Sequence, residues 1–211
     1  MPANKPWDQK PGGRRLAETQ ERRRVLIVCE DSKSSRFYFE SFPIDANRAE
    51  VRAVGTGMNT DSLVEEALRL KIEAVKNCNP YNEVWCVMDR DSFPLENYSR
   101  AFELARGRGI KVAWANEAFE FWYLLHFNYH DTGINRNDYK TKLKPYLEYE
   151  KNDKSIYRKV VPLQAGALRN AKRLERHWND LEKRFPEREN PSTNVHKLVE
   201  FLNELVELGS T

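Results

Sequence analysis

The sequence feature that most constrains the fold is an uninterrupted apolar run, Val84–Met88, which is followed at once by Asp89-Arg90-Asp91. Five apolar residues rich in β-formers are too few for a buried helix, so they predict a strand that is buried on both faces. Open α/β sheets place their ligands at the carboxyl ends of such strands. Because alternate residues of an extended segment share a face, Asp89 and Asp91 can both reach one hard cation. Most isolated Asp-x-Asp pairs are helix caps or solvated turns, so the pattern needs support from a second acidic strand end.

A second apolar run, Val25–Cys29, ends in the same way, at Glu30. Asp31 and Ser32 then supply N-cap chemistry for a helix that we expect to reach Phe42. Glu30 is therefore expected at a strand-to-helix turn, a place suited to presenting a carboxylate to a ligand. A capping or turn role would explain this glutamate equally well at this point.

Two further strands are predicted, at 49–54 and 110–115, and helices are predicted between the strands at about 60–76 and 92–106. This alternation predicts a small, mainly parallel α/β sheet of about four strands with helices on both faces. Strand signals vanish after Asn135. Helices are expected there instead, near 136–150, 164–184 and 192–207.

The organisation of the chain follows from composition. Residues 1–21 combine Pro, Gly-Gly and charged residues with almost no apolar side chains, which predicts a disordered basic arm. We expect an α/β domain over 22–134 and a helical C-terminal extension over 135–211 that packs on it. No apolar run is long enough to span a membrane and no signal peptide opens the chain, so we expect a cytoplasmic protein without membrane contact. The three cysteines are far apart in the sequence, and structural disulfides are not expected.

The formal net charge of +3 hides a strong asymmetry along the chain. Residues 136–184 carry fourteen basic and seven acidic residues, a net charge of +7, whereas residues 25–135 are net acidic. An acidic body beside a basic helical segment suits a protein that holds cations at one place and a polyanion at another, although basic residues that merely solvate helix faces give the same count. The candidates for contact with nucleic acid are Lys140, Lys142, Lys144, Arg169, Lys172, Arg173 and Arg176. The aromatic residues expected to stack on unpaired bases among them are Tyr139, Tyr146, Tyr149, Tyr157 and Trp178.

The segment 116–127 is apolar and aromatic on nearly every side, which predicts a buried helix. Glu120 would then be a carboxylate in a hydrophobic element and would need a metal, an arginine or a histidine as its partner. Six helical residues correspond to about 600° of rotation, so Glu120 and His126 should not bind one ion together. We expect Glu120 to face the acidic strand ends or to pair with a neighbouring basic group, and His126 to be mainly packed.

Several of these elements together resemble the RloB-like family, whose core is a Toprim domain, the metal-dependent fold shared with topoisomerases, primases and overcoming-lysogenization-defect nucleases. The resemblance spans about residues 22–207. The matching residues are Val28-Cys29-Glu30 with Lys33, Ser34, Tyr38 and Phe39, then Val87-Met88-Asp89-Arg90-Asp91, then Asn116 with Phe119-Glu120-Phe121-Trp122 and Leu124-Leu125-His126-Phe127, and finally Asn190-Pro191-Ser192-Thr193 with Val195.

The resemblance implies a Toprim-like fold in which Glu30 matches the single Toprim glutamate and Asp89 and Asp91 match its Asp-x-Asp. Family members often have a glycine at the position of Asp31, and acids at the positions of two serines, Ser35 and Ser92. Loss of those acids leaves the choice between one metal ion and two open. The resemblance also implies a bacterial defence role beside an ATPase partner protein, while self-association into a homo-oligomer stays open.

Three converging carboxylates would repel one another without a cation, which favours metal-dependent phosphodiester chemistry. We expect Asp89 and Asp91 to bind Mg²⁺ or Mn²⁺, and Glu30 to bind the metal or to act as a general acid or base. Lys33 is expected to steady the phosphate charge and Glu120 to support the site. No covalent nucleophile stands out, so hydrolysis of DNA or RNA, tRNA included, is favoured. The alternatives are a non-catalytic nucleic-acid-binding or phage-sensing module with the same fold, and a primase-type nucleotidyl transferase.

Overall fold

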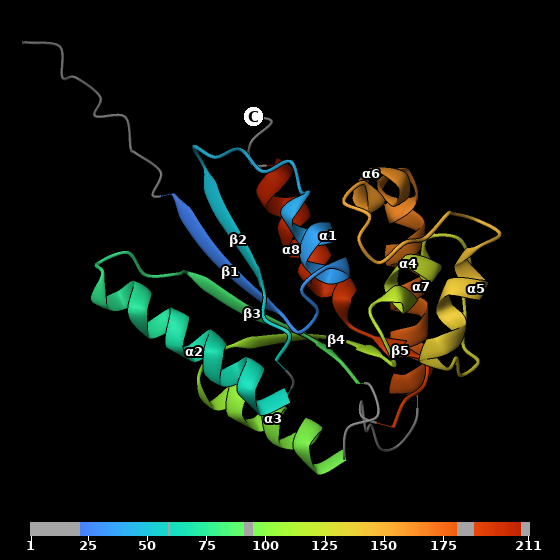
Figure 1. Cartoon of the computed structure of the whole chain (residues 1–211), viewed down its shortest axis with the longest axis horizontal. Coiled ribbons are helices and arrows are strands. Elements are labelled where there is room, and N and C mark those ends of the chain that lie inside the picture. The colour runs from blue at the N-terminus through green and yellow to red at the C-terminus, as the bar shows by residue number, and fades with distance from the viewer. Residues whose placement is uncertain (1–21, 59, 91–94, 181–187, 208–211) are drawn as a thin grey trace, which may run out of the picture.

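The computed structural model describes residues 22–58, 60–90, 95–180 and 188–207 (Figure 1). Three sequence-based expectations fall outside these residues. They are the basic arm over 1–21, Asp91 with the helix start expected at 92–94, and residues 181–184 of the helix expected over 164–184, which in the structure ends at Asn179.

A five-stranded sheet forms the centre of the molecule, with the strand order β2-β1-β3-β4-β5. The first four strands run parallel, and β5 pairs antiparallel with the end of β4. The mainly parallel α/β sheet expected from the sequence is thereby confirmed. The strands are β1 (Arg23–Cys29), β2 (Ala49–Gly55), β3 (Glu83–Asp89), β4 (Lys111–Asn116) and β5 (Ser192–Thr193).

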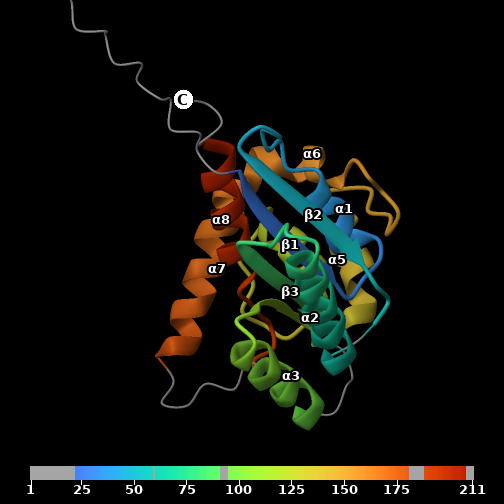
Figure 2. The ribbon, with the colours of Figure 1, turned by 90° about the vertical axis from the view of Figure 1, so that its left-hand side faces the viewer.

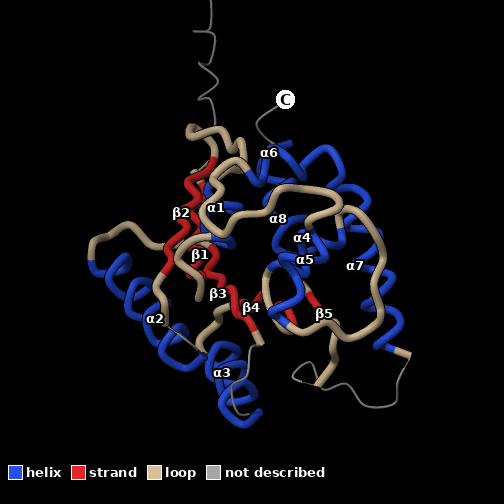
Figure 3. The backbone as a smooth tube through the Cα atoms, turned by 45° about the vertical axis from the view of Figure 1, so that its right-hand side comes forward, coloured by secondary structure: helices blue, strands red, loops and turns tan. Residues whose placement is uncertain are grey.

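Helices cover both faces of this sheet (Figure 3). The helices α2 (Thr60–Lys76) and α3 (Leu95–Gly107) pack on one face, against Leu26 and Met88 among other strand residues. The alternate strand residues, such as Ile27, point to the opposite face, because side chains alternate along a strand. There they meet α1 (Ser34–Glu40), α4 (Glu120–Leu125), α7 (Gln164–Asn179) and α8 (Val195–Glu207). In Figure 2, α7 and α8 lie on the side of the sheet away from α2.

The C-terminal half of the chain contributes a strand as well as helices. This strand, β5, extends the sheet at a place where the sequence predicts no strand. Two residues carry no detectable alternation, so this strand leaves no local signal. Its ladder is continued by one side chain: the amide of Asn194 accepts from Trp114 N at 2.6 Å and donates to Val112 O at 2.8 Å.

The prediction of a single helix over 136–150 is wrong. The structure has a 3₁₀ turn at Arg136–Asp138 and the short helix α5 (Tyr139–Leu143), followed by an irregular segment and α6 (Ile156–Val160). A second 3₁₀ turn, Val161–Leu163, leads into α7. These elements belong to the same hydrophobic cluster as α1 and α4, so they share one core with the sheet.

The aromatic helix expected over 116–127 begins only at Glu120. Asn116 and Glu117 tie the chain to later segments instead: Asn116 Nδ2 donates to Glu189 O at 2.8 Å, and the Glu117 carboxylate accepts from Arg136 N at 2.8 Å and from Asn190 Nδ2 at 3.1 Å. Within the described ranges, no helix is both long enough and apolar enough to cross a membrane.

Candidate functional site at the acidic edge of the sheet

Glu30 and Asp89 meet where two neighbouring parallel strands end. The register places Cys29 of β1 beside Val87 of β3, and Glu30 N donates to Val87 O at 3.0 Å. The Glu30 carboxylate in turn accepts a hydrogen bond from Asp89 N at 3.1 Å. The two strand-end acids are therefore held together by the β1–β3 pairing, as their positions after two apolar runs predict.

The environment of Asp89 disfavours its negative charge. Its pKa is held well above the usual value for a carboxyl, mainly by burial and further by the carboxylates of Glu120, Glu30 and Asp31. Arg136 acts in the opposite direction but does not reverse the shift. The strand ends thus gather acids whose mutual repulsion a cation would relieve.

Glu120 joins this acidic edge from α4, with a tyrosine as its partner. The hydroxyl of Tyr149 donates to Glu120 Oε1, and the same hydroxyl lies 2.9 Å from Ser34 Oγ. Burial and the Glu120 carboxylate raise the pKa of Tyr149, which keeps this hydroxyl a proton donor. Tyr123 completes the group, since its hydroxyl donates to Ser34 O at 2.9 Å. The predicted partners of Glu120 were a metal, an arginine or a histidine; Tyr149 was missed because no local pattern links it to α4.

Asp31 serves the start of α1. Its carboxylate accepts from Lys33 N at 3.1 Å and from Ser34 N at 2.7 Å, although the N-cap position is Lys33 and not Asp31 or Ser32 as the sequence predicts. Lys151 Nζ lies 3.9 Å from the same carboxylate. The side chain of Lys33 is exposed beside this turn.

His126 lies at the other end of α4, inside the core. Its Nδ1 is 2.9 Å from Trp122 O, and its ring packs against Trp122 and Tyr38. Burial lowers the pKa of His126 to about 4, so the imidazole is neutral at physiological pH. The structure thus places Glu120 at the acidic edge and His126 among aromatic side chains.

Asp91, the second acid of the Asp-x-Asp, lies outside the described residues. In the part of the chain that the structure describes, no three acidic, histidine or cysteine side chains are arranged to hold a metal ion.

Except for Lys142, the basic residues predicted to contact nucleic acid line two different hollows. Lys140 and Lys144 line a hollow of about 440 Å³ beside α5, and Lys142 is exposed on the same helix. The basic residues of α7 line a separate hollow of about 610 Å³ against α8. Those residues are Arg169, Lys172, Arg173 and Arg176.

The aromatic residues of the same segment are mostly unavailable for base stacking, which corrects the expectation from the sequence. Tyr139, Tyr149 and Tyr157 are buried because α5, α6 and the segment between them pack on α1 and α4. Trp178 is half-buried and donates from Nε1 to Pro191 O at 2.9 Å. Tyr146 is exposed, with its ring stacked on Phe127.

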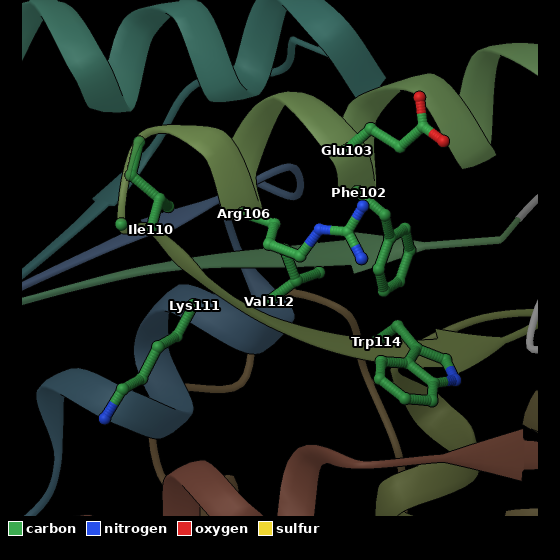
Figure 4. A pocket seen from close by; sticks show the side chains of 8 residues that line it. Phe102, Glu103, Arg106, Ile110, Lys111, Val112 and Trp114 are labelled. Atoms are coloured by element: carbon green, nitrogen blue, oxygen red, sulfur yellow. The ribbon is translucent and has the colours of Figure 1, made fainter.

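A further hollow, of about 560 Å³, lies between α3 and β4 and is lined by none of the predicted site residues. Figure 4 shows Arg106 reaching toward Phe102, whose ring contacts Trp114 on β4. This hollow is lined mainly by apolar surface from the α3 side of the sheet, and none of Glu30, Asp89 and Glu120 lines it.

Comparison with known proteins gives one finding. The family model described as RloB-like protein matches residues 25–202, which include both acidic strand ends, α4 and the segment that forms β5. No curated protein and no solved structure matches the chain. Since the family model covers most of the sequence, the chain belongs to the RloB-like family.

Proposed function

We propose that this protein is a Mg²⁺- or Mn²⁺-dependent nuclease of the Toprim type that hydrolyses phosphodiester bonds of DNA or RNA, acting in bacterial anti-phage defence with an ATPase partner. The observation that carries the proposal is the meeting of Glu30 and Asp89 at the ends of adjacent parallel strands, with the pKa of Asp89 raised by burial and by neighbouring carboxylates. Strand ends of this kind are where α/β proteins hold their ligands. The defence role and the partner follow from the family resemblance alone.

The donor set fits a hard divalent cation. Glu30 and Asp89 offer carboxylate oxygens, which are the ligands that Mg²⁺ and Mn²⁺ prefer. Asp91 follows Asp89 by two residues, a spacing that puts two side chains of an extended segment on one face. We therefore assign metal binding to Glu30, Asp89 and Asp91. Such an ion, when bound, would neutralise charge at the phosphate and lower the pKa of an attacking water.

The protein groups around these acids have supporting roles in the proposal. Tyr149 holds the Glu120 carboxylate beside Asp89, so Glu120 can orient a water or a metal ligand without leaving the edge. Lys33 is exposed at the turn after Glu30 and in this proposal steadies the charge of a bound phosphate. Alternatively, Glu30 acts as the general acid or base rather than as a ligand.

The test is cleavage of labelled DNA and of total RNA by purified protein with Mg²⁺ or Mn²⁺, in the presence and absence of its ATPase partner. We expect metal-dependent cleavage that Asp89→Asn and Glu30→Gln each reduce at least about a hundredfold. Glu83→Gln is the matched control, because Glu83 begins the strand that Asp89 ends. Cleavage that survives Asp89→Asn would refute the assignment. Nucleic-acid binding with no cleavage under any of these conditions would favour the non-catalytic module.

A further inference from the structure

The hollow between α7 and α8 has an unusual charge pattern for a surface between two packed helices. Five cationic side chains and two carboxylates line it. His196, which also lines it, is buried, and burial lowers its pKa, so it adds no positive charge near neutral pH. The cations are Arg169, Lys172, Arg173, Arg176 and Lys197.

Both carboxylates of this hollow are already neutralised by lysines. Glu175 lies 2.7 Å from Lys197 Nζ, and Glu200 pairs with Lys172. The three arginines are exposed, and among the described residues no carboxylate lies within ion-pair distance of any of them. Their charge is therefore available to a ligand from outside the chain. We call Arg169, Arg173 and Arg176 the arginine face.

The spacing of these arginines orders them on one side of α7. Positions separated by four and then three residues lie on the same face of a helix and cover about 10 Å along its axis. The guanidinium of Arg173 is held over the ring of Tyr129, 3.9 Å from its centroid. A guanidinium presents a planar fork of donors that matches phosphate oxygens, and a stacked one is partly ordered before any ligand arrives.

The hollow beside α5 differs from the α7 hollow in its net charge, the property to which a polyanion responds. Its two lysines, Lys140 and Lys144, are matched by Glu148 and Glu150, and Lys140 Nζ lies 2.7 Å from Glu150. This hollow has no net charge. The three basic residues expected to matter at α5, Lys140, Lys142 and Lys144, therefore differ from the four on α7 in a way that only the structure reveals.

We infer that the arginine face binds the phosphodiester backbone of nucleic acid without regard to sequence, and that the α5 lysines contribute little. The identification of this ligand with the substrate rests on the proposed function. Asn170 of α7 donates to Leu125 O at the end of α4, the helix that carries Glu120 at its start. That short helix, which lies beside α7 in Figure 1, connects the arginine face with the acidic edge.

The experiment compares two charge-matched triple variants of the full chain in metal-free buffer, so that binding is measured without cleavage. One variant replaces Arg169, Arg173 and Arg176 by Gln, and the other replaces Lys140, Lys142 and Lys144 by Gln. Fluorescence anisotropy with labelled single-stranded and duplex DNA and RNA of mixed sequence is recorded over a series of salt concentrations. Circular dichroism checks that each variant folds, which the exposure of all six side chains favours.

We expect the α7 variant to lose about ten- to a hundredfold in affinity and to show a shallower salt dependence by two to three charges, about 0.9 per phosphate contact on duplex DNA. The α5 variant should stay within about threefold of wild type, the effect of distant exposed charges. Wild-type affinity in the folded α7 variant, or an equal loss in both variants, would overturn the inference.

The inference and the proposed function can fail separately. Glu83→Gln should bind nucleic acid as wild type does, because it leaves both the acidic edge and the arginine face intact. Arginine-dependent binding without cleavage by the wild type would sustain the arginine face and refute the nuclease. If the α7 variant cleaves and binds nucleic acid as the wild type does, the nuclease assignment stands and the arginine face is refuted as a nucleic-acid site. An acidic protein would then be the ligand left for that face.

Discussion

The two ends of the same sheet treat their acids in opposite ways. At the amino end, Glu50 of β2 lies opposite Arg24 of β1 and receives both arms of its guanidinium, at 3.1 and 3.2 Å. Glu83 at the start of β3 lies 2.9 Å from Lys111 of β4. At the carboxyl end, Asp89 is surrounded by further carboxylates. The hydrogen bond with Arg24 lowers the pKa of Glu50, whereas burial and repulsion raise that of Asp89.

This difference separates acids that stabilise the fold from acids that do not. Ion pairs at the amino end fix the register of neighbouring strands and contribute modestly to stability. Crowded carboxylates at the carboxyl end reduce stability, and such groups are commonly kept in proteins because they serve a site. The contrast therefore points to the carboxyl end as the functional one, independently of the family to which the chain belongs.

The largest expected effect is stabilisation by metal, confined to the carboxyl end. At a concentration one hundred times its dissociation constant, Mg²⁺ or Mn²⁺ should raise the free energy of unfolding of the wild type by about 2.7 kcal/mol. Asp89→Asn should remove this gain, and Glu83→Gln should keep it. The measurement is thermal unfolding monitored by circular dichroism at increasing metal concentration. Equal stabilisation of all three proteins would mean that the ion binds elsewhere.

Part of the stability that the protein loses at low pH should come from His126 in the core, and not from either end of the sheet. The pKa of His126 is lowered to about 4 by burial, against about 6.5 in the unfolded chain. The unfolded state binds more protons between these values, so stability is lost as pH falls through this window, by about 2 kcal/mol at pH 5. His126→Gln should remove this slope, as measured by denaturant unfolding from pH 7 to pH 4.5. A slope that stays unchanged in the variant would assign it to other groups.

The sequence predicted the carboxyl end well because its signals are local. Each apolar run ends in an acid, and parallel strands bring such ends to one edge, so the meeting of Glu30 and Asp89 needed no tertiary information. Tyr149 is different, because it reaches Glu120 through a turn that leaves no periodic signal. The same holds for Asn194, whose side chain extends β5, and for Glu150, which forms an ion pair with Lys140. Contacts that single side chains make across the fold could not be predicted from the pattern of residues.

Tyr149 allows a further test of this comparison, because it is a neutral partner of an acid, Glu120, at the carboxyl end of the sheet. Tyr149→Phe removes only the hydroxyl that donates to Glu120. We expect metal affinity, followed by the stabilisation assay above, to fall about tenfold, the lower range for loss of a group that orients a metal site. Tyr157→Phe is the matched control, since Tyr157 is a buried tyrosine that packs on Phe42. Similar metal affinities in the two variants would limit Tyr149 to a packing role.

The smallest expected effect is on the stability of the metal-free protein at neutral pH. There, neutralising an acid at the carboxyl end and neutralising one at the amino end should change stability in opposite directions. Asp89→Asn removes a carboxyl group whose charged form is disfavoured by burial and by its neighbours, so it should raise the free energy of unfolding by about 1 kcal/mol, or the midpoint by roughly 2–4 °C. Glu50→Gln removes a charge that Arg24 attracts, so it should lower stability by about 0.5–1 kcal/mol. The sign, rather than the size, distinguishes a repelled acid from a paired one. Thermal unfolding in the presence of a chelator measures both variants, and a loss of stability in both would show that the Asp89 carboxylate is as well compensated in the apo protein as Glu50 is.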